Sequence, residues 1–269
     1  MTEDLLQGKP VNLRGDVHLQ VCHQEGDKPA LVFLHGGLGN RFNWRYQYEF
    51  FAQEGREVLV YDLAGHGDST PYSRYSLGRH RRDLNRLLSA LKIENPILCC
   101  HSYGVPLGLE WAQKHAVKGM IFVAGGTHDL DPWWEIPSMK LLKWVGRHLL
   151  HLPSLQNVAN SLTSNHTSAT MERFFAESPT PTDIHAYHAL EIFWGYNFFK
   201  RYQNKKAFEV PVLVFTGGQD STFTKEMGDE LASHFHHSKH LHFPAAGHVL
   251  MVEYEQEFNR AIQKWIQYL

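Results

Sequence analysis

The sequence has few cysteines, no excess of either charge and no long apolar run. Three cysteines in 269 residues, two of them adjacent, are too few for a disulfide framework and fit a reducing compartment. Twenty-six Lys and Arg against 28 Asp and Glu lack the basic excess of nucleic-acid-binding domains. Residues 1–4, Met-Thr-Glu-Asp, do not begin a signal peptide. We therefore expect a cytoplasmic protein that binds no nucleic acid and does not span a membrane.

What the sequence does have is an alternation of short apolar runs with segments of helical spacing. Runs of five residues that are mostly apolar are typical of strands buried on both faces of a parallel sheet. The predicted strands cover residues 30–34, 57–61, 96–100, 119–123, 211–215 and 239–243. The predicted helices cover residues 44–54, 77–91, 105–114 and 253–269. Residues 11–22, with Gly15-Asp16 between two runs, predict an antiparallel hairpin at one sheet edge. The sequence therefore predicts an α/β fold.

The strand pattern stops in one long internal segment. Residues 127–209 are rich in aromatic residues and contain helix-like stretches that several prolines interrupt. We interpret residues 127–209 as a helical cap inserted into a core domain made of residues 1–126 and 210–269.

A serine lies between a predicted strand and a predicted helix. Ser102 stands in the segment Cys100-His101-Ser102-Tyr103-Gly104, which follows an apolar run and precedes a helical one. This arrangement is typical of a nucleophile elbow, whose usual pattern is G-x-S-x-G, although Cys100 occupies the place of the first glycine. Ser102 is therefore the predicted nucleophile.

A serine hydroxyl needs a base within hydrogen-bond reach and a third group that orients the base. Asp220 follows the predicted strand at residues 211–215, and His248 follows the one at residues 239–243. Because parallel strands end at the same edge of a sheet, Ser102, Asp220 and His248 are expected to meet there.

Other residues compete for these roles. Asp129 or Asp131, just after the strand at residues 119–123, could supply the acid instead of Asp220. Cys100 could be the nucleophile, but the residue two positions before the elbow serine is expected to pack inward, and buried thiols are generally inert.

The predicted site also needs donors for an oxyanion. Residues 34–39, Leu-His-Gly-Gly-Leu-Gly, follow the predicted strand at residues 30–34, and their glycines allow backbone amides to face the serine. We predict the backbone N–H groups of Gly37 and Tyr103 as the oxyanion hole. His35 is expected to brace this loop through hydrogen bonds.

Taken together, these segments give the chain a clear resemblance to the α/β-hydrolase superfamily, in particular to its lid-bearing esterase and lipase-like members. The resemblance rests on His35-Gly36-Gly37, on residues 62–69 (Asp-Leu-Ala-Gly-His-Gly-Asp-Ser), and on Ser102, Asp220 and His248. It implies an eight-stranded, mostly parallel sheet with helices on both faces, a cap after the sixth strand and no cofactor. It also implies that His66 and Asp68 fix their loop and do not catalyse.

Two further groups of residues invite a functional interpretation. His234, His236, His237, His240 and His242 cluster near the last predicted strand, but they lack a cysteine or close carboxylate, so no metal site is predicted. Trp133 and Trp134 lie where the chain leaves the sheet for the predicted cap, and we predict them as a wall of the substrate pocket.

The predicted function is hydrolysis of a carboxylic ester, or a related acyl bond, of a small and largely apolar substrate through an acyl-enzyme on Ser102. The same residues could cleave a carbon–carbon bond, a lactone or a thioester, run a lyase step, or belong to a slow-turnover receptor for a small molecule. Aminopeptidase relatives usually carry a proline where this chain has Leu38. The sequence leaves the oligomeric state open.

Overall fold

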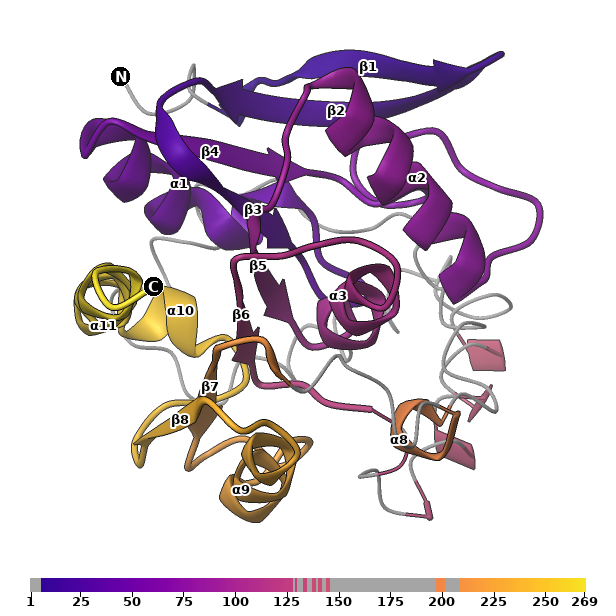
Figure 1. Cartoon of the computed structure of the whole chain (residues 1–269). Coiled ribbons are helices and arrows are strands. Elements are labelled where there is room, and N and C mark those ends of the chain that lie inside the picture. The colour runs from indigo at the N-terminus through magenta and orange to yellow at the C-terminus, as the bar shows by residue number, and fades with distance from the viewer. Residues whose placement is uncertain are drawn as a thin grey trace.

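An eight-stranded sheet forms the centre of the molecule (Figure 1). The computed structural model describes residues 6–127, 129, 133–134, 137–138, 140–141, 144–145, 197–201 and 209–269. The strands are β1 (Lys9–Arg14), β2 (Val17–Gln24), β3 (Asp27–Leu34), β4 (Arg56–Tyr61), β5 (Ile97–His101), β6 (Gly119–Val123), β7 (Val212–Gly217) and β8 (Ser238–Phe243). Each predicted strand is present, with ends shifted by a few residues.

The sheet is antiparallel at one edge and parallel elsewhere. Its order is β1-β2-β4-β3-β5-β6-β7-β8, and β1 with β2 forms the predicted edge hairpin, with Gly15 in the left-handed region at φ 48°. β2 pairs antiparallel with β4, and each later pair is parallel. The carboxyl ends of β3 to β8 therefore share one edge of the sheet, where functional loops of such folds gather.

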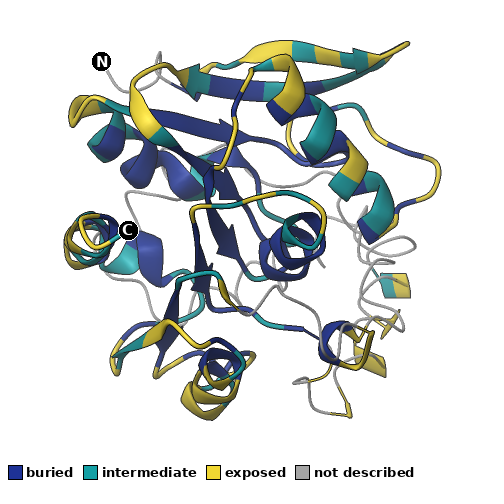
Figure 2. Ribbon diagram, in the orientation of Figure 1, coloured by how far each residue is buried: buried dark blue, intermediate teal, exposed yellow. Residues whose placement is uncertain are grey.

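Helices cover both faces of the sheet (Figure 1). On one face lie α2 (Leu77–Ala90), α3 (Gly104–Ala112), α8 (Phe198–Arg201) and α9 (Lys225–Ser233). On the other lie the short 3-10 helix η2 (Arg41–Trp44), α1 (Arg45–Gln53), α10 (Leu250–Glu253) and α11 (Glu255–Ile266). Figure 2 shows the central strands buried between these two layers.

The period of two along each strand divides the core into two halves. In β3, Val32 and Leu34 pack with α2 and α3, whereas Leu31 and Phe33 pack with α1 and α11. All four side chains are fully buried. Because both faces are covered, the strand needs apolar residues at every position, which explains the unbroken apolar runs of the sequence.

The α/β fold and its eight-stranded, mostly parallel sheet are confirmed, with two differences among the helices. α9 was not predicted from the sequence, although the Thr224 side chain caps its start by accepting a hydrogen bond from Met227 N. The helix expected over residues 253–269 is present as α11 (Glu255–Ile266), and the short α10 (Leu250–Glu253) directly before it was not predicted. Most of the predicted cap, residues 127–209, lies outside the described residues, so its boundaries remain a prediction. No helix in the described part of the chain is long and apolar enough to cross a bilayer.

Candidate active site

Ser102 lies on a sharp turn between β5 and α3. Its φ of 49° is in the left-handed region, which a residue with a side chain rarely adopts. Ser102 N donates to Val123 O at 2.9 Å, and Ser102 O accepts from Val105 N at 2.9 Å, so neighbouring backbone fixes the turn on both sides. A Cβ on Gly104 would lie 2.6 Å from Leu34 O, and one on Gly125 would lie 2.5 Å from Ser102 Cα. These two glycines allow the close approach that the turn requires.

Cys100 takes the place of the first glycine without disturbing the elbow. It is fully buried, and its Sγ points at Gly108 of α3, where a Cβ would lie only 2.5 Å away. In the usual motif a glycine on the strand leaves room for the helix. Here Gly108 on the helix leaves room for the Cys100 side chain on the strand. Burial raises the pKa of the Cys100 thiol, which keeps it protonated and unreactive near neutral pH. The structure thus argues against Cys100 as the nucleophile.

The structure brings Asp220 and His248 together from two loops. Asp220 follows β7 and His248 follows β8, and His248 Nδ1–H donates to Asp220 Oδ2 at 2.8 Å. Asp220 Oδ1 accepts from Thr222 N at 2.8 Å and Phe223 N at 3.1 Å. Burial alone would raise the pKa of Asp220, but these bonds and the imidazole outweigh it, so its pKa lies below the ordinary value. Asp220 is therefore an ionised group that orients the His248 ring.

His248 also lies beside the elbow. The ring of His101, the residue directly before Ser102, is 4.9 Å from the His248 ring between centroids, and His101 Nε2–H donates to His248 O at 2.9 Å. The side chain of Asp220 is 1% exposed and that of His248 36% exposed, so the pair has a buried end at the carboxylate and an open end at the imidazole.

The side chain of Asp129 binds the backbone at the start of α8. Its carboxylate accepts from Phe199 N at 3.2 Å and Lys200 N at 3.1 Å, at the start of α8, and from the Thr127 hydroxyl at 3.2 Å. These bonds make Asp129 a helix cap, and His248 Nδ1 bonds to Asp220 instead. Asp131, the other alternative acid, lies outside the described residues.

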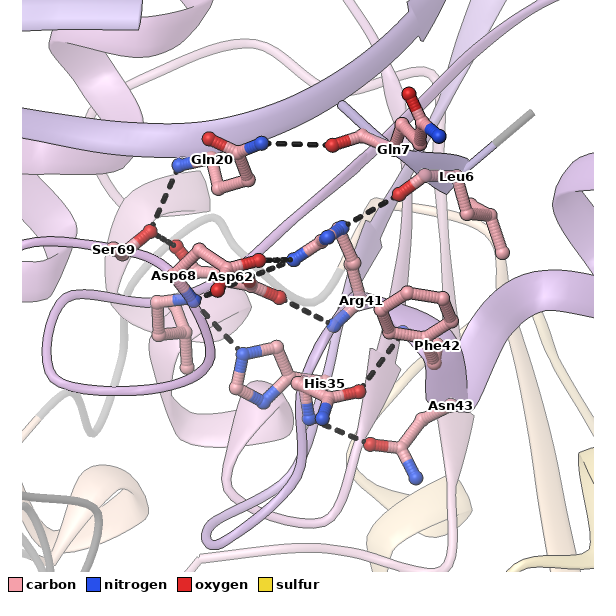
Figure 3. A network of polar contacts seen from close by, with 12 residues as sticks. Leu6, Gln7, Gln20, His35, Arg41, Phe42, Asn43, Asp62, Asp68 and Ser69 are labelled. Carbon is pink, nitrogen blue, oxygen red and sulfur yellow. Dashed lines mark hydrogen bonds and ion pairs between the residues drawn. The ribbon is translucent and has the colours of Figure 1, made fainter. Parts of the chain in front are cut away.

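His35 braces the glycine-rich loop, as predicted (Figure 3). Its Nδ1–H donates to Gly36 O at 2.7 Å, and its Nε2 accepts from Leu63 N at 3.0 Å. Complete burial lowers the pKa of His35 to about 3, so the ring is neutral and each nitrogen has a fixed role. A Cβ on Gly36 would lie 2.9 Å from Ser102 Cβ, so this loop passes directly against the elbow. Gly37, the predicted oxyanion donor, follows in the same loop.

A charged cluster, Arg41-Asp62-Asp68, ties the start of η2, just after the glycine-rich loop, to the loop after β4 (Figure 3). Arg41 Nη1 forms ion pairs with Asp62 and, at 2.9 Å, with Asp68, and Arg41 Nε donates to Leu6 O at 2.9 Å. Asp62 also accepts from Asp68 N at 3.0 Å, which supports the loop-fixing role predicted for Asp68. Arg41 could not be predicted from the sequence, because no local pattern pairs the start of η2 with the loop after β4.

Tyr103, whose backbone N–H is the second predicted oxyanion donor, is anchored through its side chain. His80 of α2 donates from Nε2 to Ala64 O at 3.2 Å, so its Nδ1 accepts from the Tyr103 hydroxyl at 3.0 Å. Burial lowers the pKa of His80 to about 3, which keeps this nitrogen free to accept. A histidine at a helix position gave no sequence signal for this role.

Two of the histidines near β8, His240 and His242, form hydrogen bonds with side chains of the neighbouring β7 and α9. His240 donates to Asp229 Oδ1 at 2.7 Å and accepts from the Thr216 hydroxyl at 2.7 Å, and Thr216 accepts from His242 Nδ1 at 2.9 Å. Among the described residues, no group of three or more His, Cys, Asp or Glu side chains is placed to hold a metal ion.

The two tryptophans predicted as a pocket wall lie at the surface. Trp133 is 88% exposed and Trp134 is 45% exposed. Their assignment to a substrate pocket stays a prediction.

Comparison with known proteins gives a consistent result. A family model for the alpha/beta hydrolase fold matches residues 29–254. Proline iminopeptidase from Lactobacillus helveticus is 24% identical, over 98% of both chains, and 3-oxoadipate enol-lactonase 2 from Acinetobacter baylyi is 27% identical, over 89% of both. An esterase from Exiguobacterium antarcticum superposes with a TM-score of 0.78 at 18% identity, over 93% of this chain and 96% of that one. The chain therefore belongs to the α/β-hydrolase family.

Proposed function

We propose that this protein is a serine hydrolase that cleaves a carboxylic ester, or a related acyl bond, of a small and largely apolar substrate. Membership in the α/β-hydrolase family supports hydrolysis in general. The observation that carries the finer proposal is the hydrogen-bonded Asp220–His248 pair, with a buried carboxylate and a partly exposed imidazole, beside an elbow on which Ser102 has left-handed backbone.

The proposed mechanism assigns each residue a step. His248 Nε2 takes the proton of the Ser102 hydroxyl as Oγ attacks the acyl carbon. Asp220 stays ionised and keeps its hydrogen bond with His248 Nδ1–H. The N–H groups of Gly37 and Tyr103 hold the oxyanion of the tetrahedral intermediate. His248 then gives the proton to the leaving alkoxide, and water, activated by the same imidazole, releases the acid from Ser102.

The brace around the glycine-rich loop supports this assignment of the oxyanion hole. Donors stabilise a developing charge best when they are held in place before the reaction begins. His35 and Arg41 fix the loop that carries Gly37, and His80 fixes Tyr103. The proposed hole therefore needs no large rearrangement.

Leu38 favours an ester over a peptide substrate. Its φ is 62°, whereas the proline that aminopeptidase relatives usually have there is restricted to a φ near −65°. The conformation of this loop thus departs from the one that the aminopeptidase pattern requires. A lactone is a cyclic ester, so lactone cleavage falls within the same proposal.

The test is hydrolysis of chromogenic esters of increasing acyl length, with lactones in the same series and Ser102→Ala alongside. The proposal predicts saturable turnover with an optimum chain length, and a loss of about 10³-fold or more in kcat for the variant. Ester turnover that survives Ser102→Ala would overturn it. Tight binding without multiple turnover would favour the receptor alternative.

A further inference from the structure

His101 joins three parts of the candidate site through one ring. It is the last residue of β5, directly before Ser102, and is only 4% exposed. Its Nε2–H donates to the backbone carbonyl of His248 at 2.9 Å, and the two rings lie 4.9 Å apart at an angle of 56°. On the other side, a Cβ on Gly36 would lie 2.9 Å from His101 Nδ1. The ring is thus enclosed between the glycine-rich loop and the loop that carries His248.

The hydrogen bonds on this ring leave a single arrangement. A carbonyl can only accept, so Nε2 carries the proton and Nδ1 carries none while the ring is neutral. Nδ1 is buried and has no hydrogen-bond partner in the described part of the chain. Burial lowers the pKa of His101 to about 3, so the ring is neutral near pH 7. Among the described residues, the bond from Nε2–H to the His248 carbonyl is therefore the one hydrogen bond that the His101 side chain makes.

In the described part of the chain, the other backbone hydrogen bonds that hold the His248 loop are made by neighbours of His248. Gly247 N donates to Glu253 Oε2 at 2.7 Å, and Gln219 N donates to Ala246 O at 2.8 Å. The side chain of His248 is held at Nδ1 by Asp220, a bond about which the ring can still tilt. The bond to the His248 carbonyl restrains the backbone at this residue, and together with the Asp220 bond at Nδ1 it restrains the position of Nε2.

We propose, resting on the proposed function, that His101 is a positioning residue for the general base: its Nε2–H holds the His248 carbonyl and so aims His248 at Ser102. A displacement of about 1 Å in a reacting group can lower the rate about 100-fold. Removal of this bond should therefore lower kcat and leave KM nearly unchanged.

Three substitutions separate the hydrogen bond from packing. In His101→Gln the amide nitrogen reaches the place of Nε2, in His101→Asn it reaches only the place of Nδ1, and His101→Leu has no donor. We expect kcat on the preferred ester to fall about 10–100-fold in the Asn and Leu variants, with KM within about twofold, and to stay within about threefold of wild type in the Gln variant.

A proton NMR signal provides a readout that does not depend on activity. The Nδ1–H proton of His248, bonded to Asp220, is identified by its loss in Asp220→Asn. We expect this signal to remain in the Gln variant and to broaden or disappear in the Asn and Leu variants, with circular dichroism confirming that each variant is folded.

Equal loss in all three variants, or an unchanged kcat and signal in His101→Leu, would overturn the positioning role. Absence of ester hydrolysis in the wild type would instead count against the proposed function, and the NMR comparison would still decide the role of His101.

Discussion

Asp220 and Asp129 both follow parallel strands of the sheet, and their hydrogen bonds separate their roles. Asp220 accepts from the His248 ring, whereas Asp129 accepts from the first backbone amides of α8. Both residues satisfied the sequence criterion, which was only a carboxylate after a strand. The contacts that distinguish them join residues 28 and 70 positions apart. No local pattern could have supplied that distinction.

The matched substitutions Asp220→Asn and Asp129→Asn test this assignment. Asn at position 220 keeps the shape but removes the charge that orients the imidazole, so we expect kcat to fall about 10²–10⁴-fold. Asp129→Asn replaces one of the two accepting oxygens by an NH2 group that cannot accept, so it should cost about 1 kcal/mol of stability and leave kcat within about threefold. The measurements are steady-state kinetics and denaturant unfolding on both variants. A larger loss of kcat in Asp129→Asn than in Asp220→Asn would instead make Asp129 the carboxylate that orients His248.

The central strands β4 to β7 could be predicted one by one, because a strand covered on both faces needs apolar residues along its length. The helix α9 could not be predicted in this way. Only three of its nine residues are buried (Gly228, Leu231 and Ala232), and the remaining ones are mostly polar. The order of the strands in the sheet could not be predicted from local patterns either. β4 lies between β2 and β3, and this arrangement depends on pairing between segments that are far apart in the sequence.

Cys100 and Gly108 are a pair of complementary residues on β5 and α3. Gly108→Ala would place a Cβ 2.5 Å from Cys100 Sγ, so we expect it to destabilise the protein by about 1–3 kcal/mol despite the better helix propensity of alanine. In a Cys100→Ala background the sulfur is gone, and the same substitution should be neutral or stabilising. Urea unfolding of the four proteins gives the coupling energy. Additive effects would show that the two residues do not share this space.

At the scale of the whole molecule, four buried histidines surround the candidate site: His35, His66, His80 and His101. Their rings lie inside the fold with 0 to 4% exposure, and burial lowers each pKa to about 3. The unfolded chain binds protons at these groups below about pH 6.5, whereas the folded chain does so only near pH 3. Between these values the unfolded state holds more protons, so the free energy of unfolding falls as the pH falls.

We therefore expect stability to drop steeply between pH 6.5 and pH 4.5, by about 1.4 kcal/mol per pH unit for each such histidine. Urea unfolding at a series of pH values measures this slope. His66→Phe is the matched variant, because His66 Nε2 has no hydrogen-bond partner in the described part of the chain and a phenyl ring has similar bulk. In this variant the free energy of unfolding should change less steeply with pH, by about 1.4 kcal/mol per pH unit, which corresponds to one proton. A stability that stays level down to pH 5 would contradict the account.

The most direct test of the central claim, that Ser102 is an activated nucleophile, is mass spectrometry after reaction with a fluorophosphonate. In this reaction the nucleophile forms a bond to phosphorus and fluoride leaves, giving an adduct that water removes slowly. The account predicts one adduct, on the peptide that contains Ser102, with no labelling of Ser102→Ala and slow labelling of His248→Ala. An adduct on another residue, or undiminished labelling of Ser102→Ala, would contradict it.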